Sequence, residues 1–327
     1  MSAAATPLER FKSAYWSRYA GDMAECERRL SAISAEAGGT LGESCSLTLA
    51  AGGKRLRPLL VFLAAPSGAT IGEAQQAAAA AVELVHMATL VHDDVLDGAE
   101  LRRGKPTLMA AYGSEVSSTA GDYLFASAFR MLTAAGSPRA VSILAQTSLD
   151  LSLGELAQME QTGDFELAPE AYYERCRLKA AGLFSASCGL GALLSGCSGE
   201  TIAAMDEFGL HLGLAFQIAD DILDFAGDAG AIGKRAGADL RDGTVTLPLL
   251  MAMERDGSLR GLLGGKLTDE AIAEICRRIQ ASGALDEERK EALEQVWHVG
   301  EALEASAGEV DIGRLGLIAE LGGERRG

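Results

Sequence analysis

Apolar residues recur at the three- to four-residue spacing of amphipathic helices along almost the whole chain of 327 residues. No alternating strand pattern and no clear hairpin signal interrupts them. The spacing predicts helices over residues 7–35, 39–51, 55–66, 71–97, 114–135, 138–162, 169–196, 199–226, 245–254, 268–281 and 286–306. The longest break, residues 227–243, carries charge, and loops of that length are often functional. No shift in composition marks a linker, so the pattern predicts one all-α domain over residues 1–327.

The composition indicates a globular protein with a large core and a strong negative charge. Hydrophobic residues make up 48% of the chain and charged residues 23%, which allows a large core. The net charge of −17 argues against nucleic acid and anionic membrane surfaces as partners. The six cysteines form no C-x-x-C pair and indicate reduced thiols. The first residues lack the pattern of a secretory signal, and the apolar runs are too short to cross a bilayer. We therefore expect a soluble, cytoplasmic protein without stable membrane insertion.

Two copies of one acidic pattern give the first indication of chemistry. Residues 93–97 read DDVLD and residues 220–224 read DDILD, each within an apolar helical run. On a helix, Asp93 stacks on Asp97 and Asp220 stacks on Asp224, because positions i and i+4 share a face. Stacked like charges destabilise a helix unless a cation lies between them. Two such clusters facing each other are suited to hard divalent ions, above all Mg²⁺, and to a diphosphate ligand.

Basic residues occur at positions where they could bind the phosphate groups of such a ligand. Lys54 and Arg57 stand directly before a predicted helix, where exposed amides and cations together bind phosphate. Arg102 and Arg103 follow the first acidic cluster and can contact two different phosphate groups. Lys179 interrupts an apolar helix, where a lysine more often reaches out to solvent. Ordinary surface charge is the alternative explanation for each of these residues.

Two other kinds of site are not supported. Lys234 follows a glycine as in a phosphate-binding loop, but Asp228 replaces the first glycine and Arg235 replaces the metal-binding Ser or Thr. The four histidines lack zinc-ligand spacing. His86 precedes Asp93 by two helical turns on the same face, although a lone histidine there is more often a packed core residue.

Taken in order, these segments resemble the trans-isoprenyl diphosphate synthases, also called polyprenyl synthetases. The resemblance rests on GKRLRP at 53–58, His86 to Asp97, LRRGKPT at 101–107, GDYL at 121–124, Lys179, FQIADDILD at 216–224, Gly233-Lys234 and Asp239-Leu240. The chain departs from many relatives at Ala180, Arg235 and Thr244, where they carry Thr, Pro and Lys.

The resemblance implies an all-α helical bundle with a central cavity, an isoprenoid synthase-like fold, and a homodimer. It implies three Mg²⁺ ions per active site, with Mn²⁺ as an alternative, held by Asp93, Asp97, Asp220 and Asp224 with support from Asp94 and Asp221. The allylic diphosphate would contact Arg102, Lys179, Gln217 and Lys234. Isopentenyl diphosphate would contact Lys54, Arg57, His86 and Arg103.

The implied reaction is the head-to-tail (1'-4) condensation of isopentenyl diphosphate with an allylic diphosphate, which gives an all-trans polyprenyl diphosphate. Metals and fixed cations stabilise the charge on the departing diphosphate, and a dry apolar cavity protects the carbocation. Product length would depend on the tunnel below Asp93, since one helical turn rises about 5.4 Å. Relatives with short products commonly carry aromatic residues at the level of Ala88 and Thr89. Their small size here predicts a product longer than C20, octaprenyl-like, with the next wall at Phe125, Phe129 or Met131.

Other interpretations fit less well. A geranylgeranyl diphosphate (C20) synthase would share every motif and differ only in tunnel depth. Class I terpene cyclases usually replace the second acidic cluster and lack the Lys54/Arg57 seat. A non-catalytic regulatory subunit would carry degraded clusters, whereas all six carboxylates are present. An acidic helical scaffold explains neither the stacked carboxylates nor the matching cations.

Overall fold

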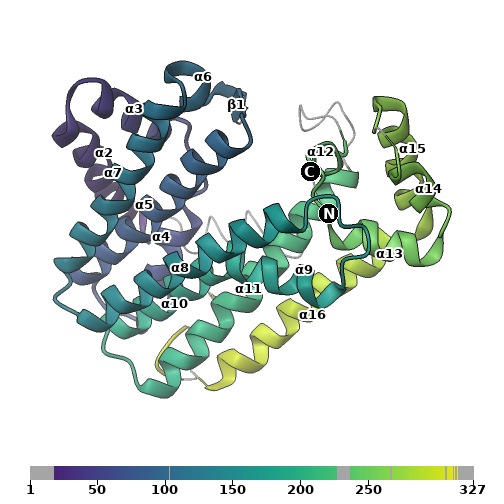
Figure 1. Ribbon diagram of the computed structural model, residues 1–327. Helices are drawn as coiled ribbons and strands as arrows, with labels where there is room; N and C mark the ends of the chain where they lie inside the picture. Colours follow the sequence, from purple (N-terminus) through teal and green to yellow (C-terminus); the bar gives the residue numbers. More distant parts are fainter. Residues whose placement is uncertain are drawn as a thin grey trace, which may run out of the picture.

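The computed structural model describes residues 18–102, 104–226, 236–265, 267–305, 308–311, 313 and 315. These residues form packed helices and one short antiparallel hairpin (Figure 1). The elements of the first half are α2 (Ala20–Ala37), α3 (Gly39–Ala50), α4 (Leu56–Leu63), α5 (Glu73–Leu96), β1 (Leu101–Arg102), β2 (Lys105–Pro106), α6 (Leu108–Tyr112), α7 (Ser114–Thr133) and α8 (Pro138–Glu160). The second half comprises α9 (Pro169–Cys176), the π-helical turn η2 (Arg177–Ala181), α10 (Gly182–Leu194), α11 (Gly199–Ala226), α12 (Ala238–Arg241), α13 (Leu247–Arg255), α14 (Leu259–Leu263), α15 (Asp269–Ser282) and α16 (Ala284–Ala305).

The predicted all-α class is confirmed, and most long helices lie within a few residues of their predicted bounds. Local chemistry explains several of the ends. The Ser137 hydroxyl accepts a hydrogen bond from the Ala140 amide at the start of α8, directly before Pro138 in the first helical position. Thr268 caps α15 in the same way, and Gly283 ends that helix in the left-handed conformation. Residues 7–17 of the first predicted helix lie outside the described residues.

The structure differs from the predicted local structure in five places. The helix predicted over 169–196 is interrupted by η2, and the segments taken as loops contain α6, α12 and α14. The hairpin β1–β2 was missed because its two-residue strands are too short to show alternation; Gly104 supplies the left-handed turn. A helix of four or five residues likewise gives too little periodicity to detect.

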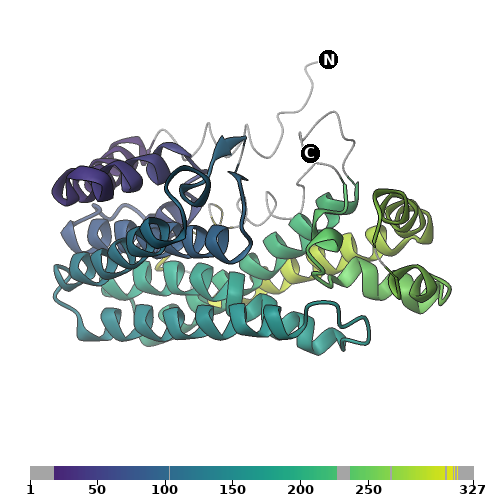
Figure 2. The same cartoon turned by 45° about the horizontal axis from the view of Figure 1, so that its top comes forward.

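The core is divided into two clusters that α11 connects. The first cluster holds α2, α4, α5, α7 and α10, and α11 contributes Phe208 and Leu212 to it. The second holds α13, α15 and part of α16, and α11 contributes Ile222 and Phe225. Figures 1 and 2 show the consequence: α2 and α3 lie at one end of the molecule and α14 and α15 at the other. The first acidic pattern therefore ends a helix of the first cluster, and the second lies on the part of α11 that contributes to the second cluster.

Within the described residues, no helix is long and apolar enough to cross a membrane.

Candidate active site

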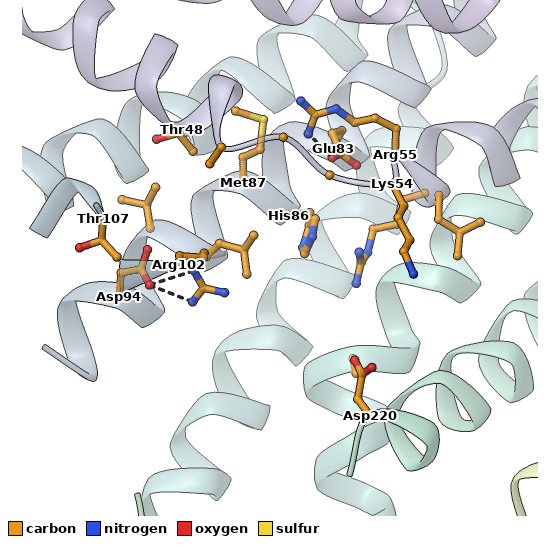
Figure 3. Close-up of a pocket in the computed structure, with 18 of the residues that line it drawn as sticks. Thr48, Lys54, Arg55, Glu83, His86, Met87, Asp94, Arg102, Thr107 and Asp220 are labelled. Atoms are coloured by element: carbon orange, nitrogen blue, oxygen red, sulfur yellow. Dashed lines mark hydrogen bonds and ion pairs between the residues drawn. The ribbon is translucent and has the colours of Figure 1, made fainter. Parts of the chain in front are cut away.

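A cavity of about 620 Å³ opens between the segment that joins α3 to α4, the second half of α5, the β1–β2 hairpin, α10 and α11. Its wall is partly apolar, with Met87, Phe184 and Phe216 among the lining residues. Figure 3 shows Lys54, His86 and Arg102 pointing into this space, with Asp220 on its far side. The cavity therefore combines an apolar wall with several cations.

Five basic residues line this cavity from three separate segments of the chain: Lys54, Arg55, Arg57, His86 and Arg102. Arg57 lies on the first turn of α4, and its guanidinium stands 4.6 Å from the centre of the buried Phe184 ring. Such stacking holds a guanidinium in one orientation while its charge stays active. Lys54, Arg57 and Arg102 give this cavity a local positive charge in a chain whose net charge is −17, and the imidazole of His86 adds a hydrogen-bonding group.

The first acidic cluster is matched by cations. Asp94 is buried, and both Nε and Nη2 of Arg102 lie 2.9 Å from the same carboxylate oxygen. Asp93 is half-buried and Asp97 caps the C-terminus of α5. Burial raises the pKa of Asp93 to about 6, although the charge of Lys179 opposes this shift. Burial raises the pKa of Asp97 as well. Burial thus disfavours the charged form of both carboxylates, and the nearby cations Lys179 and Arg102 favour it.

Lys179 lies in the π-helical turn η2, and its Nζ is 2.5 Å from Oε2 of Glu155 on α8. Turns of this kind occur often at functional sites. A Cβ on Gly154 would lie 2.7 Å from the backbone nitrogen of Lys179, so only glycine permits this close approach of α8. Lys179 does not line the cavity, but its neighbour Ala180 does, and its charge acts on Asp93 and Asp97.

In the second acidic cluster, Asp221 and Asp224 accept hydrogen bonds from neutral donors. Asp220 is exposed and lines the cavity. Asp221 is buried and accepts hydrogen bonds from the Tyr172 hydroxyl at 2.7 Å and the Gln217 amide at 2.8 Å. Burial raises the pKa of Asp221 to about 6. The carboxylate of Asp224 accepts the backbone amides of Ala238 and Asp239 at the start of α12.

The predicted substrate- and metal-binding residues thus fall into four groups. Seven line the cavity: Lys54, Arg57, His86, Asp94, Arg102, Gln217 and Asp220. Asp93, Asp97 and Lys179 stand beside it and interact electrostatically, whereas Asp221 and Asp224 hold neighbouring structure. Arg103 and Lys234 lie outside the described residues. Among the described side chains no three acidic, His or Cys groups already converge as a metal site.

The predicted chain-length residues are not equivalent. Ala88 has no accessible surface, and its role in product length stays a prediction. Small side chains on α5 and α7 let these two helices pack closely, as the full burial of Ala88, Ala120 and Ala128 indicates. Thr89, Phe125 and Phe129 keep accessible surface, and the two phenyl rings lie 5.5 Å apart.

Sequence reasoning missed the partners of the cations and of the acids. Glu83, Glu155 and Tyr172 contact Arg55, Lys179 and Asp221, respectively. A signal existed for Glu83, which is a lone acid in the apolar run before His86. No local signal distinguishes Glu155 or Tyr172, because their partners are distant in sequence.

Fold and cavity define an all-α protein with a cleft lined by basic residues and by one aspartate from each acidic pattern. A family model for polyprenyl synthetases matches residues 39–279. The chain is 40% identical over 281 residues to heptaprenyl diphosphate synthase component 2 of Geobacillus stearothermophilus, covering 86% of this chain and 88% of that protein. It is 35% identical to octaprenyl diphosphate synthase of Escherichia coli (strain K12), covering 75% and 77%.

A solved structure gives the same result. The polyprenyl synthase of Caulobacter crescentus, in complex with calcium and isoprenyl diphosphate, superimposes with a TM-score of 0.89 at 34% identity over 100% of both chains. The protein belongs to the polyprenyl synthetase family, and it is a prenyltransferase.

Proposed function

We propose that the protein condenses isopentenyl diphosphate with an allylic diphosphate and makes an all-trans polyprenyl diphosphate longer than C20. The observation that carries this proposal is the cavity itself, in which Lys54, Arg57, His86 and Arg102 surround a space that Asp220 closes from the opposite side. These basic residues exceed what a single diphosphate needs, which supports a site for two diphosphate substrates. The names of the hepta- and octaprenyl diphosphate synthases among its relatives support the product class.

Each substrate has its own set of contacts in this proposal. Lys54, Arg57 and His86 receive the diphosphate of isopentenyl diphosphate, with Arg103 as a further contact outside the described residues. Arg102, Lys179 and Gln217 receive the allylic diphosphate, with Lys234 likewise undescribed. Lys179 first has to exchange its ion pair with Glu155 for the ligand, and the Gln217 amide already donates to Asp221. Gln217 thus acts on the substrate only through its remaining hydrogen-bonding capacity.

The acidic residues fit a hard divalent cation, for which we propose Mg²⁺, three ions per site, with Mn²⁺ as a substitute. Asp93, Asp97 and Asp220 offer oxygen donors, and burial raises the pKa of Asp93 to about 6, which shows that its negative charge is poorly compensated. Asp224 would join them, since each oxygen that accepts one amide keeps a second lone pair. Bound metal would neutralise charge on the departing diphosphate. The protein's own part is to orient the diphosphate through Arg102 and Lys179 and to exclude water with Phe184 and Phe216.

For product length we propose the partly accessible side chains Thr89, Phe125 and Phe129 rather than Ala88. A growing chain can lie beside residues that keep accessible surface without first separating α5 from α7. Phe125 and Phe129 lie one helical turn apart on α7, so they form an aromatic wall rather than a single stop.

We infer that a second copy of the chain covers α8. Leu149, Leu153, Leu156 and Met159 are each more than half exposed and recur at helical spacing on this helix. The stripe is uncharged, so two copies can meet there despite the negative charge of the chain. Light scattering of the purified protein should give twice the chain mass, and Leu153→Glu should give the monomer. A mass of one chain for the wild type would point to a different partner, as the name "component 2" of one relative implies for that protein.

Product analysis tests the proposed reaction. Purified protein receives magnesium, labelled isopentenyl diphosphate and farnesyl or geranylgeranyl diphosphate, and chromatography gives the chain length. Products of six or more isoprene units support the proposal. A product of four units would make the protein a geranylgeranyl diphosphate synthase. Absence of elongation with every primer would contradict prenyl elongation and direct attention to the cyclase and regulatory-subunit alternatives. The cytoplasmic location stays a prediction.

A further inference from the structure

Arg55 stands between Lys54 and Arg57, two cations of the proposed isopentenyl diphosphate seat, and borders the same cavity, and its guanidinium is bound by groups of the protein. Its side chain is 9% exposed, and Nη1 donates to Oε1 of Glu83 on α5 at 2.8 Å. Nε donates to Oε1 of Glu27 on α2 at 2.5 Å, and Nη2 donates to the Leu49 carbonyl at 3.3 Å, near the end of α3. One guanidinium therefore joins three helices at the start of a fourth, α4.

The backbone at this residue is unusual as well. Among the described residues Arg55 is the one non-glycine with positive φ, at 48°. Left-handed backbone is unfavourable for a side chain with a Cβ, so surrounding contacts must maintain it. The turn at Arg55 leads the Gly52–Lys54 segment into α4, whose first turn carries Arg57. The conformation of Arg55 thus sets the direction of the cation on either side of it.

The partner of Arg55 lies close to the third member of the seat. Glu83 precedes His86 by three residues, so both occupy nearly the same face of α5. The Glu83 side chain is 4% exposed, and a buried carboxylate of this kind needs its ion pair. The Arg55–Glu83 pair consequently connects the segment that holds Lys54 and Arg57 to the helix that holds His86. Figure 3 shows Arg55 beside Glu83, while Lys54 and His86 point into the cavity.

We propose that Arg55 is a positioning residue, which uses Glu83, Glu27 and the Leu49 carbonyl to hold Lys54 and Arg57 at a fixed separation from His86. This inference rests on the proposed function, since it assigns the three held cations to the diphosphate of isopentenyl diphosphate. A lysine cannot replace Arg55, because an ammonium lacks the planar fork that reaches acceptors on three helices. The contribution is specific to one substrate, since Arg102 and Lys179 are anchored separately by Asp94 and Glu155.

Two variants and one matched control test this role. Arg55→Lys keeps the charge and loses the fork, and Glu83→Gln keeps the shape and loses the buried charge. Glu73→Gln removes the exposed ion pair of Arg29 with Glu73, which joins the same two helices, α2 and α5, away from the cavity. Steady-state kinetics with each substrate varied in turn gives both KM values and kcat. Calorimetric titration of isopentenyl diphosphate without metal or allylic substrate gives a Kd independent of turnover.

For Arg55→Lys and Glu83→Gln we expect KM and Kd for isopentenyl diphosphate to rise about tenfold. The KM for the allylic substrate and kcat should stay within about twofold, since affinity for a single substrate is lost. Glu73→Gln should match the wild type in all four quantities. If Glu83→Gln does not fold, Arg55→Lys alone decides the question.

Unchanged KM and Kd for isopentenyl diphosphate in an active Arg55→Lys variant would overturn the positioning role. Equal increases in both KM values would also overturn it, because they would indicate a general loss of structure. A wild-type protein that neither binds isopentenyl diphosphate nor elongates any primer would instead overturn the proposed function on which the inference rests.

Discussion

The two acidic clusters are nearly identical in sequence and differ in almost everything that surrounds them. In the first, at the end of α5, the buried Asp94 is paired with the guanidinium of Arg102, and Lys179 acts on the other two acids. In the second, at the end of α11, Asp221 is held by a hydroxyl and an amide, and Asp224 by two backbone amides. The buried aspartate of the first cluster, Asp94, is thus held by a charge pair, whereas the buried aspartate of the second, Asp221, is held by neutral hydrogen-bond donors.

This difference shows that the same spacing of three aspartates can have two roles, one in the cavity and one in holding neighbouring helices together. Neutral donors fix a carboxylate without cancelling its charge, whereas an arginine both fixes and neutralises it. The second cluster therefore also holds the protein together, because Asp221 joins α11 to α9 and Asp224 joins α11 to α12. Asp220 is the member of that cluster that lines the cavity.

The largest expected effect concerns the first cluster. Asp93→Asn should lower kcat by about 10²–10³-fold, because it removes charge that the proposed metal ions need. The melting temperature should not fall, since burial already disfavours the ionised carboxyl. Incorporation of labelled isopentenyl diphosphate measures the activity, with the exposed Glu115→Gln on α7 as control. Full activity of Asp93→Asn would remove this cluster from the catalytic site.

The second cluster should respond to loss of a neutral donor. Tyr172→Phe leaves the buried Asp221 with one donor instead of two, and should lower the free energy of unfolding by about 1–3 kcal/mol. Urea denaturation measures this change, with Tyr112→Phe, at an exposed tyrosine, as control. Unchanged stability would mean that Asp221 does not depend on this hydrogen bond, and the contrast between the clusters would weaken.

The free energy of unfolding should depend on pH through Glu288, a buried residue of α16 near the second acidic cluster. Burial, together with the charges of Asp221 and Glu291, raises the pKa of Glu288 to about 10. The folded state keeps a proton that the unfolded chain releases above its ordinary pKa of 4.5, so stability should fall as pH rises from about 4.5 toward 10. Glu288→Gln should reduce that loss by more than about 1 kcal/mol between pH 6 and 9. Chemical denaturation at several pH values measures it, and an identical slope in the variant would contradict it.

A substitution at a position where the two acidic clusters differ in sequence should change kcat least of all, but should change the length of the product clearly. Four residues before the first aspartate stands Thr89 on α5 and Phe216 on α11. Thr89→Phe gives α5 the aromatic residue of α11, and should shorten the product by one or more isoprene units while kcat changes by less than about twofold. Chromatography of the products measures this. Ala88→Phe is the informative comparison, because at a fully buried position it should destabilise the protein instead. An unaltered product from Thr89→Phe would place the chain-length control elsewhere.

The sequence was sufficient to predict helices with a long periodic pattern and site residues that belong to extended motifs. The helix predicted over 199–226 matches α11, and the cations predicted around the diphosphates include four that line one cavity. It was insufficient where the cause is tertiary. Nothing local reveals that Asp221 meets Tyr172 or that Lys179 meets Glu155, because these partners come from helices far apart in the chain. The small residues of α5 were read as an opening, whereas in the structure they permit close packing by α7.

The claim that the acidic clusters act through metal, while the basic seat acts alone, can be tested directly by binding. Calorimetry would compare isopentenyl diphosphate and farnesyl diphosphate, each titrated separately with and without Mg²⁺. We expect isopentenyl diphosphate to bind in both conditions with similar Kd, and farnesyl diphosphate to bind tightly only with Mg²⁺. Equally tight binding of farnesyl diphosphate without metal would contradict the account, because carboxylates that lack a cation repel a diphosphate.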